Sequence, residues 1–302
     1  MPLCCDTYHC LRHMRRLTGF FMLRIVTDSS SEISQEEAAR LGIEVLPLTI
    51  IFGSEQFRDG IDINSEQFYN KLVSSSEFPH TAQLGYDELM GVFGNAKAKG
   101  DEVLVIPIAS ALSGSFEWAE RAAAESGYDK IKVYDSKCTT FMLEILVREA
   151  VRLKERPVEE VVAALDELRP RIKLLAALDT LEYLKRGGRI NKTVATVGSM
   201  LKIKPVITVS GEGKVELIHK SIGMNAALRY ISERFLADKK DENYAVRTIY
   251  CMEQSNCEKL RSLAGIDGAP YENICPVIGT HIGPKAAGLV YVGAKDAGSK
   301  KA

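Results

Sequence analysis

The sequence has no long hydrophobic run, no excess of one sign of charge and no regular set of cysteines. None of its apolar stretches approaches the 18 or more residues that a membrane-spanning helix needs, so stable membrane insertion is not expected. The 39 Lys and Arg residues nearly balance the 40 Asp and Glu residues, which gives no electrostatic reason to expect nucleic acid as a partner. The 7 cysteines are odd in number and unevenly spread, as is typical of reduced thiols in a cytoplasmic protein.

Several signatures of enzymes are also missing. No G-x-G-x-x-G follows a strand-like segment and no P-loop is present, so no dinucleotide or nucleotide site is predicted. No G-x-S-x-G turn occurs, which weakens the case for an α/β-hydrolase. Cys4, Cys5, Cys10 and His13 match no zinc spacing. We therefore expect no metal and no cofactor.

The composition is that of an ordinary globular protein with a sizeable core. The chain has 302 residues, of which 46% are hydrophobic and 26% charged, which suits one large domain or two medium ones. Residues 1–21 are basic, Cys-rich and aperiodic, and we expect a non-native or disordered leader with the natural product starting at Met22. The Lys/Ala/Gly tail at residues 295–302 is expected to be disordered.

Strand-like and helix-like segments alternate along the rest of the chain, which favours βα units and mostly parallel or mixed sheets. Residues 22–156 are predicted to form an N-terminal α/β domain, and Pro157, between two helices, opens a C-terminal α/β domain over 157–294. The predicted strands are 23–27, 45–52, 103–108, 131–134, 174–178, 205–209, 215–219, 245–251, 274–279 and 288–292, and Gly211-Glu212-Gly213 is predicted to join 205–209 and 215–219 as a hairpin. The predicted helices are one from Ser34 to Gly42, then 65–73, 116–126, one ending near 154, 181–185 and 225–236.

The most informative segment is residues 278–284, Ile-Gly-Thr-His-Ile-Gly-Pro. Glycine allows close approach of the backbone or a positive φ, and proline stiffens the exit. We therefore predict a shaped loop that presents His281, whose imidazole titrates closest to neutral pH. The alternative is a turn that contains a hydrogen-bonded histidine.

Small hydroxyl-bearing turns follow several predicted strands, where ligands of open α/β sheets collect. Ser113-Gly114-Ser115 is the sharpest case, because it opens a helix whose free N–H groups and dipole suit an anion. Plain N-capping is the alternative for each serine. The other members of this set are Ser29, Ser30, Thr81 and Ser136.

Residues 184–190, Leu-Lys-Arg-Gly-Gly-Arg-Ile, are also unusual. Arg186 and Arg189 flank a glycine pair, and guanidinium groups match phosphate geometry. A helix C-cap is the alternative, and spacing alone favours it.

Taken together, these segments resemble the DegV family from about residue 23 to residue 292. The motifs that carry the resemblance, in family order, are residues 27–30, 81–83, 112–115, 135–137, 184–190, 204–205 and 278–284. The resemblance implies a bacterial cytosolic protein of two α/β domains that binds a long-chain fatty acid in a buried tunnel between them. It also implies a partner, an ATP-dependent fatty acid kinase, to which the carboxylate is presented for acyl phosphate formation.

The resemblance also assigns roles to residues of this sequence. Thr81, Ser113 with Gly114, and His281 would hold the fatty-acid carboxylate. Arg186 and Arg189 would face the head group or the docked kinase. Further head-group or kinase-facing positions are Ser29, Ser30 and Thr280.

The sequence departs from the family pattern at several positions. Ala82 replaces a serine, Leu84 a proline and Ser115 a threonine, changes that leave the head-group chemistry intact. Phe141, Met142 and Glu144 stand where small residues and glycines are usual, which bears on tunnel width and on the preferred acyl chain. Ile222 stands where an arginine is common and Lys285 where a glycine is usual, and the first of these bears on the kinase contact.

Two other functions fit the same residues. One is a serine hydrolase or esterase with Ser113 as nucleophile, His281 as base and Asp28 or Asp135 as the orienting group. The other is a carrier of a different amphiphile. The absence of an acid/base pair favours a binding protein over an enzyme.

Overall fold

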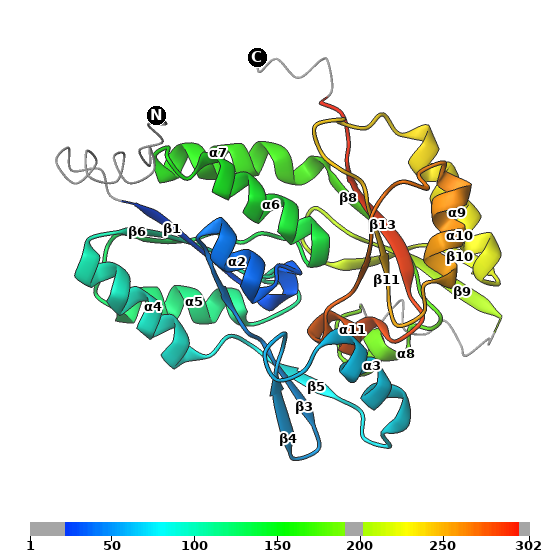
Figure 1. Cartoon of the computed structure of the whole chain (residues 1–302), viewed down its shortest axis with the longest axis horizontal. Helices are drawn as coiled ribbons and strands as arrows, with labels where there is room; N and C mark the ends of the chain where they lie inside the picture. Colours follow the sequence, from blue (N-terminus) through cyan, green and yellow to red (C-terminus); the bar gives the residue numbers. More distant parts are fainter. Residues whose placement is uncertain (1–21, 191–201, 296–302) are drawn as a thin grey trace, which may run out of the picture.

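The computed structural model describes residues 22–190 and 202–295, and a parallel sheet organises the first half (Figure 1). Its strand order is β2-β1-β6-β7, and every neighbouring pair is parallel. β1 is almost entirely buried, as expected for a strand covered on both faces. The four strands are β1 (Leu23–Asp28), β2 (Glu44–Leu46), β6 (Glu102–Ile106) and β7 (Ile131–Val133).

Helices cover both faces of this sheet (Figure 1). α4 (Tyr86–Lys99) and α5 (Ser115–Glu125) lie on one face, and α2 (Gln35–Leu41) and α6 (Thr140–Leu153) on the other. α7 (Val158–Leu168) packs on α6. The predicted domain boundary at Pro157 falls between α6 and α7 and stays a prediction.

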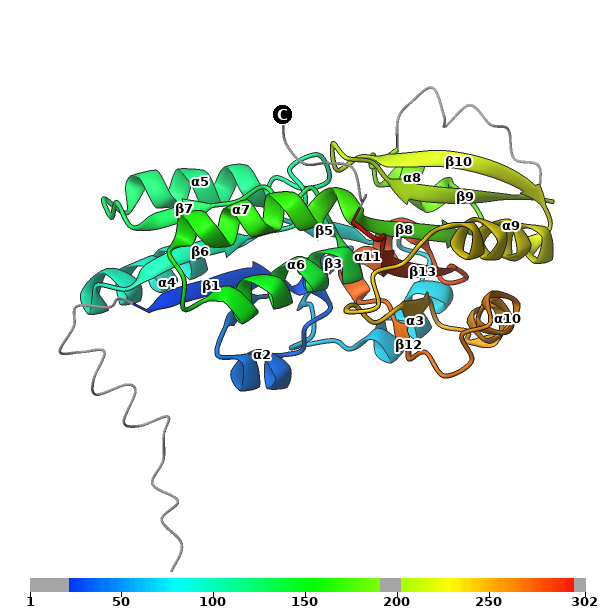
Figure 2. The ribbon, with the colours of Figure 1, turned by 90° about the horizontal axis from the view of Figure 1, so that it is seen from above.

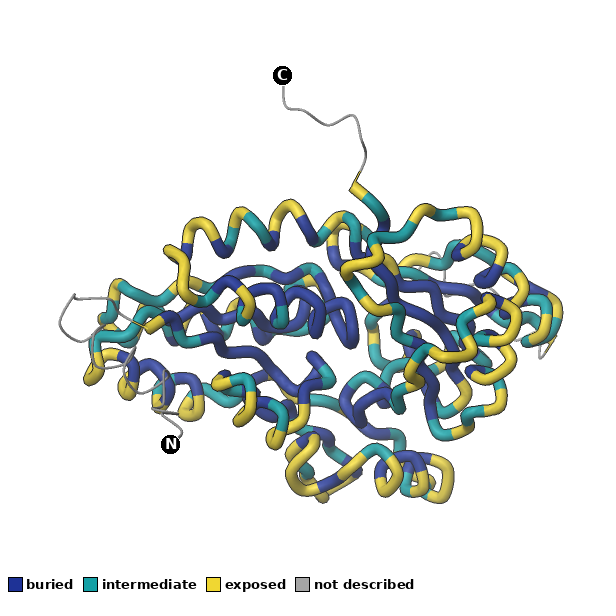
Figure 3. The backbone as a smooth tube through the Cα atoms, turned by 45° about the horizontal axis from the view of Figure 1, so that its top comes forward, coloured by how far each residue is buried: buried dark blue, intermediate teal, exposed yellow. Residues whose placement is uncertain are grey.

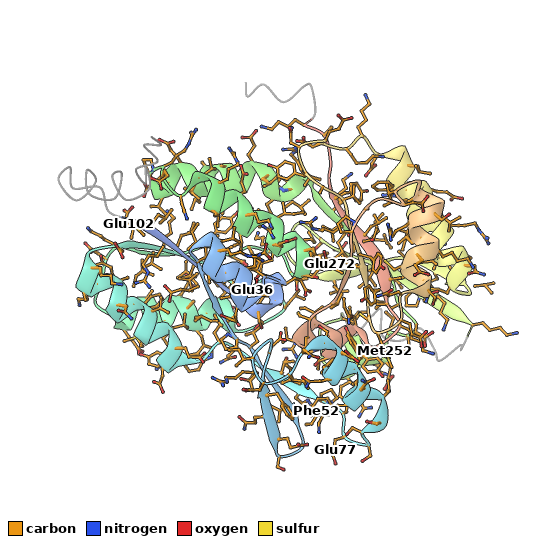
Figure 4. All side chains as sticks on the ribbon, viewed as in Figure 1. Glu36, Phe52, Glu77, Glu102, Met252 and Glu272 are labelled. Carbon is orange, nitrogen blue, oxygen red and sulfur yellow. The ribbon has the colours of Figure 1, made fainter. Side chains whose placement is uncertain are left out.

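A three-stranded antiparallel sheet, ordered β4-β3-β5, extends from the first half. Its strands are β3 (Thr49–Phe52), β4 (Glu55–Arg58) and β5 (His80–Ala82), and α3 (Ser65–Ser74) packs beside it. Figure 4 labels Phe52 on β3. The centroid of its ring lies 6.0 Å from the ring centroid of Phe68 on α3. The single strand predicted over 45–52 is therefore wrong: the chain leaves the parallel sheet at Pro47, which has no N–H to donate to a ladder.

The second half is built on a six-stranded mixed sheet with the order β10-β9-β8-β13-β11-β12. Among the described strands of this sheet, β11 and β12 pair in parallel and the other neighbours pair antiparallel. The predicted hairpin of β9 and β10 is confirmed. The strands are β8 (Ile172–Ala177), β9 (Ile203–Val209), β10 (Val215–Ile222), β11 (Arg247–Tyr250), β12 (Tyr271–Asn273) and β13 (Ala287–Val292).

α9 (Met224–Ala237) and α10 (Ser255–Ala264) cover one face of this sheet (Figure 2). Along β8, Leu175 and Ala177 pack toward these helices, while Leu174 and Ala176 belong to the core of the first half. This alternation follows from the two-residue period of a strand. The main core contains residues of both halves, and Figure 3 shows buried segments in each of them.

Two short helices, α8 (Glu182–Arg186) and α11 (Pro276–Ile282), pack against each other near the three-stranded sheet (Figure 1). α11 replaces both the strand predicted over 274–279 and the loop predicted over 278–284. The predicted α/β class with parallel and mixed sheets is confirmed. Residues 1–21 and 296–302, on which two expectations fall, lie outside the described residues. No helix in the described ranges is long and apolar enough to cross a membrane.

Candidate functional site

The structure brings Thr81 and His281 into direct contact although they are 200 residues apart. Thr81 Oγ1 lies 2.9 Å from His281 Nε2. Thr81 is on β5, and His281 is in the last turn of α11. The helix ends at Gly283, whose φ of +80° suits glycine, and a Cβ there would lie 2.5 Å from the Tyr183 ring of α8. The glycine therefore allows α8 and α11 to approach closely.

His281 is held as a neutral imidazole. Burial, with smaller contributions from Arg189 and His80, lowers its pKa to about 3. Its Nδ1 atom is buried and has no hydrogen-bond partner among the described residues. Gly187 faces this atom so closely that a Cβ would stand 2.3 Å from it. Nε2 is thus the only ring nitrogen with a polar partner.

Ser113 lies in the turn that leads into α5. Its Oγ accepts a hydrogen bond from Ser115 N at 3.3 Å and lies 2.9 Å from Ser115 Oγ. Gly114 is the N-cap of α5. A Cβ at Gly114 would lie 2.6 Å from Oε1 of Gln83. The prediction that this turn opens a helix is confirmed.

Thr81, Ser113 and His281 line one cavity with Arg189. The cavity opens to solvent, and the space inside it for molecules the size of water is about 60 Å³. The rest of its wall is mostly apolar and includes Leu48, Ile108, Leu112, Leu184, Val277 and Ile282. An apolar cavity with a few polar groups on one side suits an amphiphilic ligand.

The two predicted arginines occupy different places. Arg189 lines the cavity and donates from Nε to Leu112 O at 3.1 Å and from Nη1 to Gly187 O. Burial lowers its pKa. Arg186 is exposed on α8, and its guanidinium lies 3.8 Å from the centre of the Phe78 ring. Arg189 is thus near the polar atoms, and Arg186 is on the outer surface.

Three predicted head-group or kinase-facing residues, Ser29, Ser30 and Thr280, are not among the residues that line this cavity, and their assigned role stays a prediction. The Ser29 hydroxyl donates to Asp59 at 2.9 Å, and the Ser30 hydroxyl donates to Asp28. Thr280 is 1% exposed and donates to Pro276 O at 3.0 Å within α11. Each of the three hydroxyls thus donates its hydrogen bond to another group of the protein.

The groups of a serine hydrolase are not assembled. His281 faces Thr81 rather than Ser113, and its low pKa makes it a poor base. Asp28 accepts from Ser30 and from Ile108 N, and Asp135 accepts from Ser110. Within the described ranges, no carboxylate orients the imidazole. The same ranges contain no cluster of three or more potential metal ligands, and the Cys4, Cys5, Cys10 and His13 group lies outside them.

Sequence reasoning missed Gln83, Gly187 and most of the apolar wall. The glycine pair at 187–188 indicated close approach, but not that His281 would be the neighbour. The wall residues come from many separate elements, so no local pattern marks them. Only the assembled fold identifies them.

Fold and site together define an α/β protein with an apolar ligand cavity whose polar side carries hydroxyls, an arginine and a neutral imidazole. The chain belongs to the DegV family: the family profile described as "Uncharacterised protein, DegV family" matches residues 22–294.

Individual relatives agree with this assignment. A DegV domain-containing protein of Caldanaerobacter subterraneus subsp. tengcongensis is 32% identical over 286 residues, covering 89% of this chain and 98% of that protein. A fatty-acid-binding DegV family protein from Thermus thermophilus is 29% identical, with a TM-score of 0.79 and coverage of 91% of this chain and 100% of that one. A stearic acid-binding protein from Eubacterium ventriosum is 26% identical, with a TM-score of 0.77 and coverage of 90% and 98%.

Proposed function

We propose that this protein binds a long-chain fatty acid, with the carboxylate beside Thr81, Ser113 and His281 and the acyl chain in a tunnel that starts at the apolar cavity. The observation that carries the proposal is the Thr81–His281 hydrogen bond on the polar side of that cavity. The fatty acids bound by the Thermus thermophilus and Eubacterium ventriosum relatives support the ligand class.

The protonation state of His281 determines which groups donate and which accept hydrogen bonds in the proposed site. A carboxylate accepts hydrogen bonds and cannot donate them. If neutral His281 donates its Nε2–H to Thr81 Oγ1, the Thr81 hydroxyl is free to donate its own proton to the carboxylate. The lack of a partner for Nδ1 agrees with a bare lone pair there and a proton on Nε2. The imidazole thus acts through Thr81.

Arg189 supplies the positive charge in the proposed site. Its Nε and Nη1 atoms bond to backbone carbonyls, which fixes the guanidinium plane and leaves other N–H donors. In the part of the chain that the structure describes, no ion pair joins it to a carboxylate. The carboxylate of the ligand, or the phosphate formed from it, would provide the missing charge partner.

The acyl chain would dominate the affinity. Burying a 16-carbon chain removes roughly 14 methylenes from water at about 0.8 kcal/mol each, or about 11 kcal/mol before ordering costs. A hydrogen bond to a charged carboxylate adds about 1.5–3 kcal/mol. The polar residues would therefore set the orientation of the ligand, and the apolar wall its affinity.

The proposal includes presentation of the carboxylate to a partner kinase in the cytoplasm. No P-loop is present in the sequence, so ATP must be brought by another protein. Arg186 is exposed, with its guanidinium over the Phe78 ring, and suits a phosphate-handling surface. Ile222, 79% exposed at the end of β10, stands where the family resemblance expects arginine. Docking would be weaker here or use a different partner.

Native mass spectrometry of the purified protein, followed by organic extraction, tests the ligand. We expect a copurifying fatty acid, and Ser113→Ala or His281→Ala should weaken palmitate binding with the fold retained. Thr208→Val is a matched control, because its hydroxyl donates to Leu174 O away from the cavity. No extracted lipid together with no binding of added palmitate or oleate would refute the proposal.

Mixing the protein, oleate and ATP with and without the fatty acid kinase of the same genome tests presentation. Acyl phosphate should form only when the kinase is added. ATP consumption by this chain alone would show that it is an enzyme. No product with the kinase would leave a lipid carrier.

A further inference from the structure

The first turn of α11 is held by two carboxyl groups from the other end of the chain. Pro276 has no N–H, so the first donors at this helix start are Cys275 and Val277. Cys275 N donates to Glu32 Oε2 at 2.9 Å, and Val277 N donates to Asp59 Oδ2 at 3.4 Å. The N–H groups of a helix start have no partner within the helix. These two carboxyls therefore set where the helix begins.

Asp59 is also tied to the sheet that carries Thr81. It directly follows β4, and its own N–H donates to Leu48 O at 2.8 Å, just before β3. Ser29 Oγ donates to the same Asp59 oxygen at 2.9 Å and accepts from Leu48 N at 3.1 Å. The carboxyl of Asp59 is thus fixed relative to the β4-β3-β5 sheet.

His281 lies one helical turn beyond the residue that Asp59 holds. Val277 and His281 are four positions apart, so they share one face of α11. Asp59 therefore links the sheet that carries Thr81 to the helix that carries His281.

Glu32 braces the same turn from a second direction. Its Oε1 accepts from Thr140 Oγ1 at 2.7 Å, while Oε2 holds Cys275. Glu32 and Thr140 have φ values of +62° and +50°, a region that non-glycine residues seldom occupy. Such conformations persist where the surroundings over-determine them. The contacts of Glu32 supply that constraint.

We propose that Asp59 and Glu32 are positioning residues of the ligand site, which act through α11 to hold His281 Nε2 in line with Thr81 Oγ1. The expected effect of Asp59 and Glu32 on fatty-acid binding rests on the proposed function. Their expected effect on the orientation of the His281 imidazole does not.

The chemistry of the cluster argues against a role in stability alone. Among the described residues, no Lys or Arg pairs with either carboxyl, and Asp28 lies near enough to add to the repulsion at Asp59. Burial raises the pKa of Glu32 to about 8 and that of Asp59 to about 7. Uncompensated buried carboxyls destabilise a protein relative to apolar side chains of similar size. What the carboxyls provide instead is two fixed acceptors at one helix start.

A double-mutant cycle in palmitate affinity tests the proposal. Asp59→Ala should weaken binding by about tenfold or more, comparable with loss of a hydrogen bond to a charged group. In a His281→Ala background the same change should cost less than about twofold, because Asp59 acts through His281. Asp59→Asn keeps an acceptor oxygen and should stay within about threefold of the wild type.

The control is Glu149→Gln, which alters a buried carboxylate that pairs with Arg152 on α6 and contacts neither α11 nor the cavity. It should leave palmitate affinity unchanged. The proposal would be overturned if the fold-losses of palmitate affinity in Asp59→Ala and His281→Ala simply multiplied in the double variant. If Asp59→Ala does not fold, Glu32→Ala enters the same cycle.

A second measurement needs no ligand. The imidazole ¹⁵N resonances of His281, assigned by their loss in His281→Ala, should indicate a single Nε2–H tautomer in the free wild-type protein. Asp59→Ala should move them toward averaged tautomers. Unchanged resonances in Asp59→Ala would refute positioning even if palmitate binds. Failure of the wild type to bind palmitate would refute the proposed function alone.

Discussion

The imidazole of His281 shows how surroundings select one use of a versatile side chain. A histidine in water changes charge near neutral pH, but here burial lowers its pKa to about 3. With Nδ1 packed against Gly187 and Nε2 facing Thr81, the ring can pass on a hydrogen bond but cannot act as a base at neutral pH. The same residue that suggested catalysis in the sequence therefore argues for binding in the structure.

The low pKa of His281 predicts an acid-dependent loss of stability. The unfolded chain takes up a proton at this side chain near pH 6.5, but the folded protein does so only near pH 3. Its contribution to stability is therefore present above pH 6.5 and is lost as the pH falls toward 3. Between pH 7 and pH 5, ligand-free wild type should lose up to about 2 kcal/mol more unfolding free energy than His281→Gln. Urea unfolding at both pH values measures this, and equal losses in the two proteins would contradict it.

At the scale of elements, α11 marks the limit of prediction from sequence. The alternation of strand-like and helix-like segments, together with glycines at the turns, was enough to predict the β9–β10 hairpin and the helix α5 close to their observed bounds. Residues 274–279 are apolar and partly β-branched, which favours a strand, yet they enter a helix of 7 residues. That helix is too short to be stable on its own. Its capping groups, Glu32 and Asp59, come from more than 200 residues away, so no local pattern contains them.

The contact of α11 with α3 predicts a steric effect at Gly279. A Cβ at this position would lie 2.6 Å from Tyr69 Oη and 2.8 Å from a Phe68 ring atom, both fully buried. Gly279→Ala should therefore destabilise the fold by about 1–3 kcal/mol, as overpacking does. It should also weaken ligand binding, because α11 must shift.

Gly91→Ala in α4 is the matched control, since nothing lies within 4 Å of a Cβ there. It should raise stability by about 0.4–1 kcal/mol, the usual gain for alanine in a helix. Thermal melts of both variants measure the difference. A Gly279→Ala protein as stable as the wild type would show that α11 and α3 are packed loosely.

The carboxyl cluster beside α11 predicts a pH dependence of the opposite sign to that of His281. The folded pKa of Asp59, about 7, lies above its unfolded value of 3.8. Its contribution to stability is therefore greatest below pH 4 and is lost as the pH rises through 7. The ionisable groups that face the cluster are Asp28, Glu32, Tyr69, Cys251 and Cys275.

Asp59→Asn removes this titration, so its stability relative to wild type should improve from pH 4.5 to pH 7.5. Chemical unfolding of both proteins at those two pH values gives the comparison, with Asp62→Asn as an exposed control near the same strand. A constant difference between the wild type and Asp59→Asn would mean that Asp59 is ionised in the folded protein throughout this range.

At the scale of the whole molecule, the two halves share one core. Alternate residues of β8 face the first half and the α9–α10 layer, and the cavity is lined from both halves. A sequence divided into two α/β regions predicts two units, but it cannot tell whether they unfold together. The shared core indicates that they do, because separating them would expose buried apolar surface.

The shared core makes cooperative unfolding the expected outcome, and one side chain allows a direct test. Trp118, the single tryptophan, lies on α5 in the first half, so its fluorescence reports that half while far-UV circular dichroism reports both. The two melting curves should coincide. Because the proposed ligand contacts both halves, palmitate at about 100 times its dissociation constant should stabilise the whole protein by about 2.7 kcal/mol and raise both curves together. A second dichroism transition without a fluorescence change would show that the halves unfold separately. A shift of only one transition with palmitate would place the ligand within one half and not between the two.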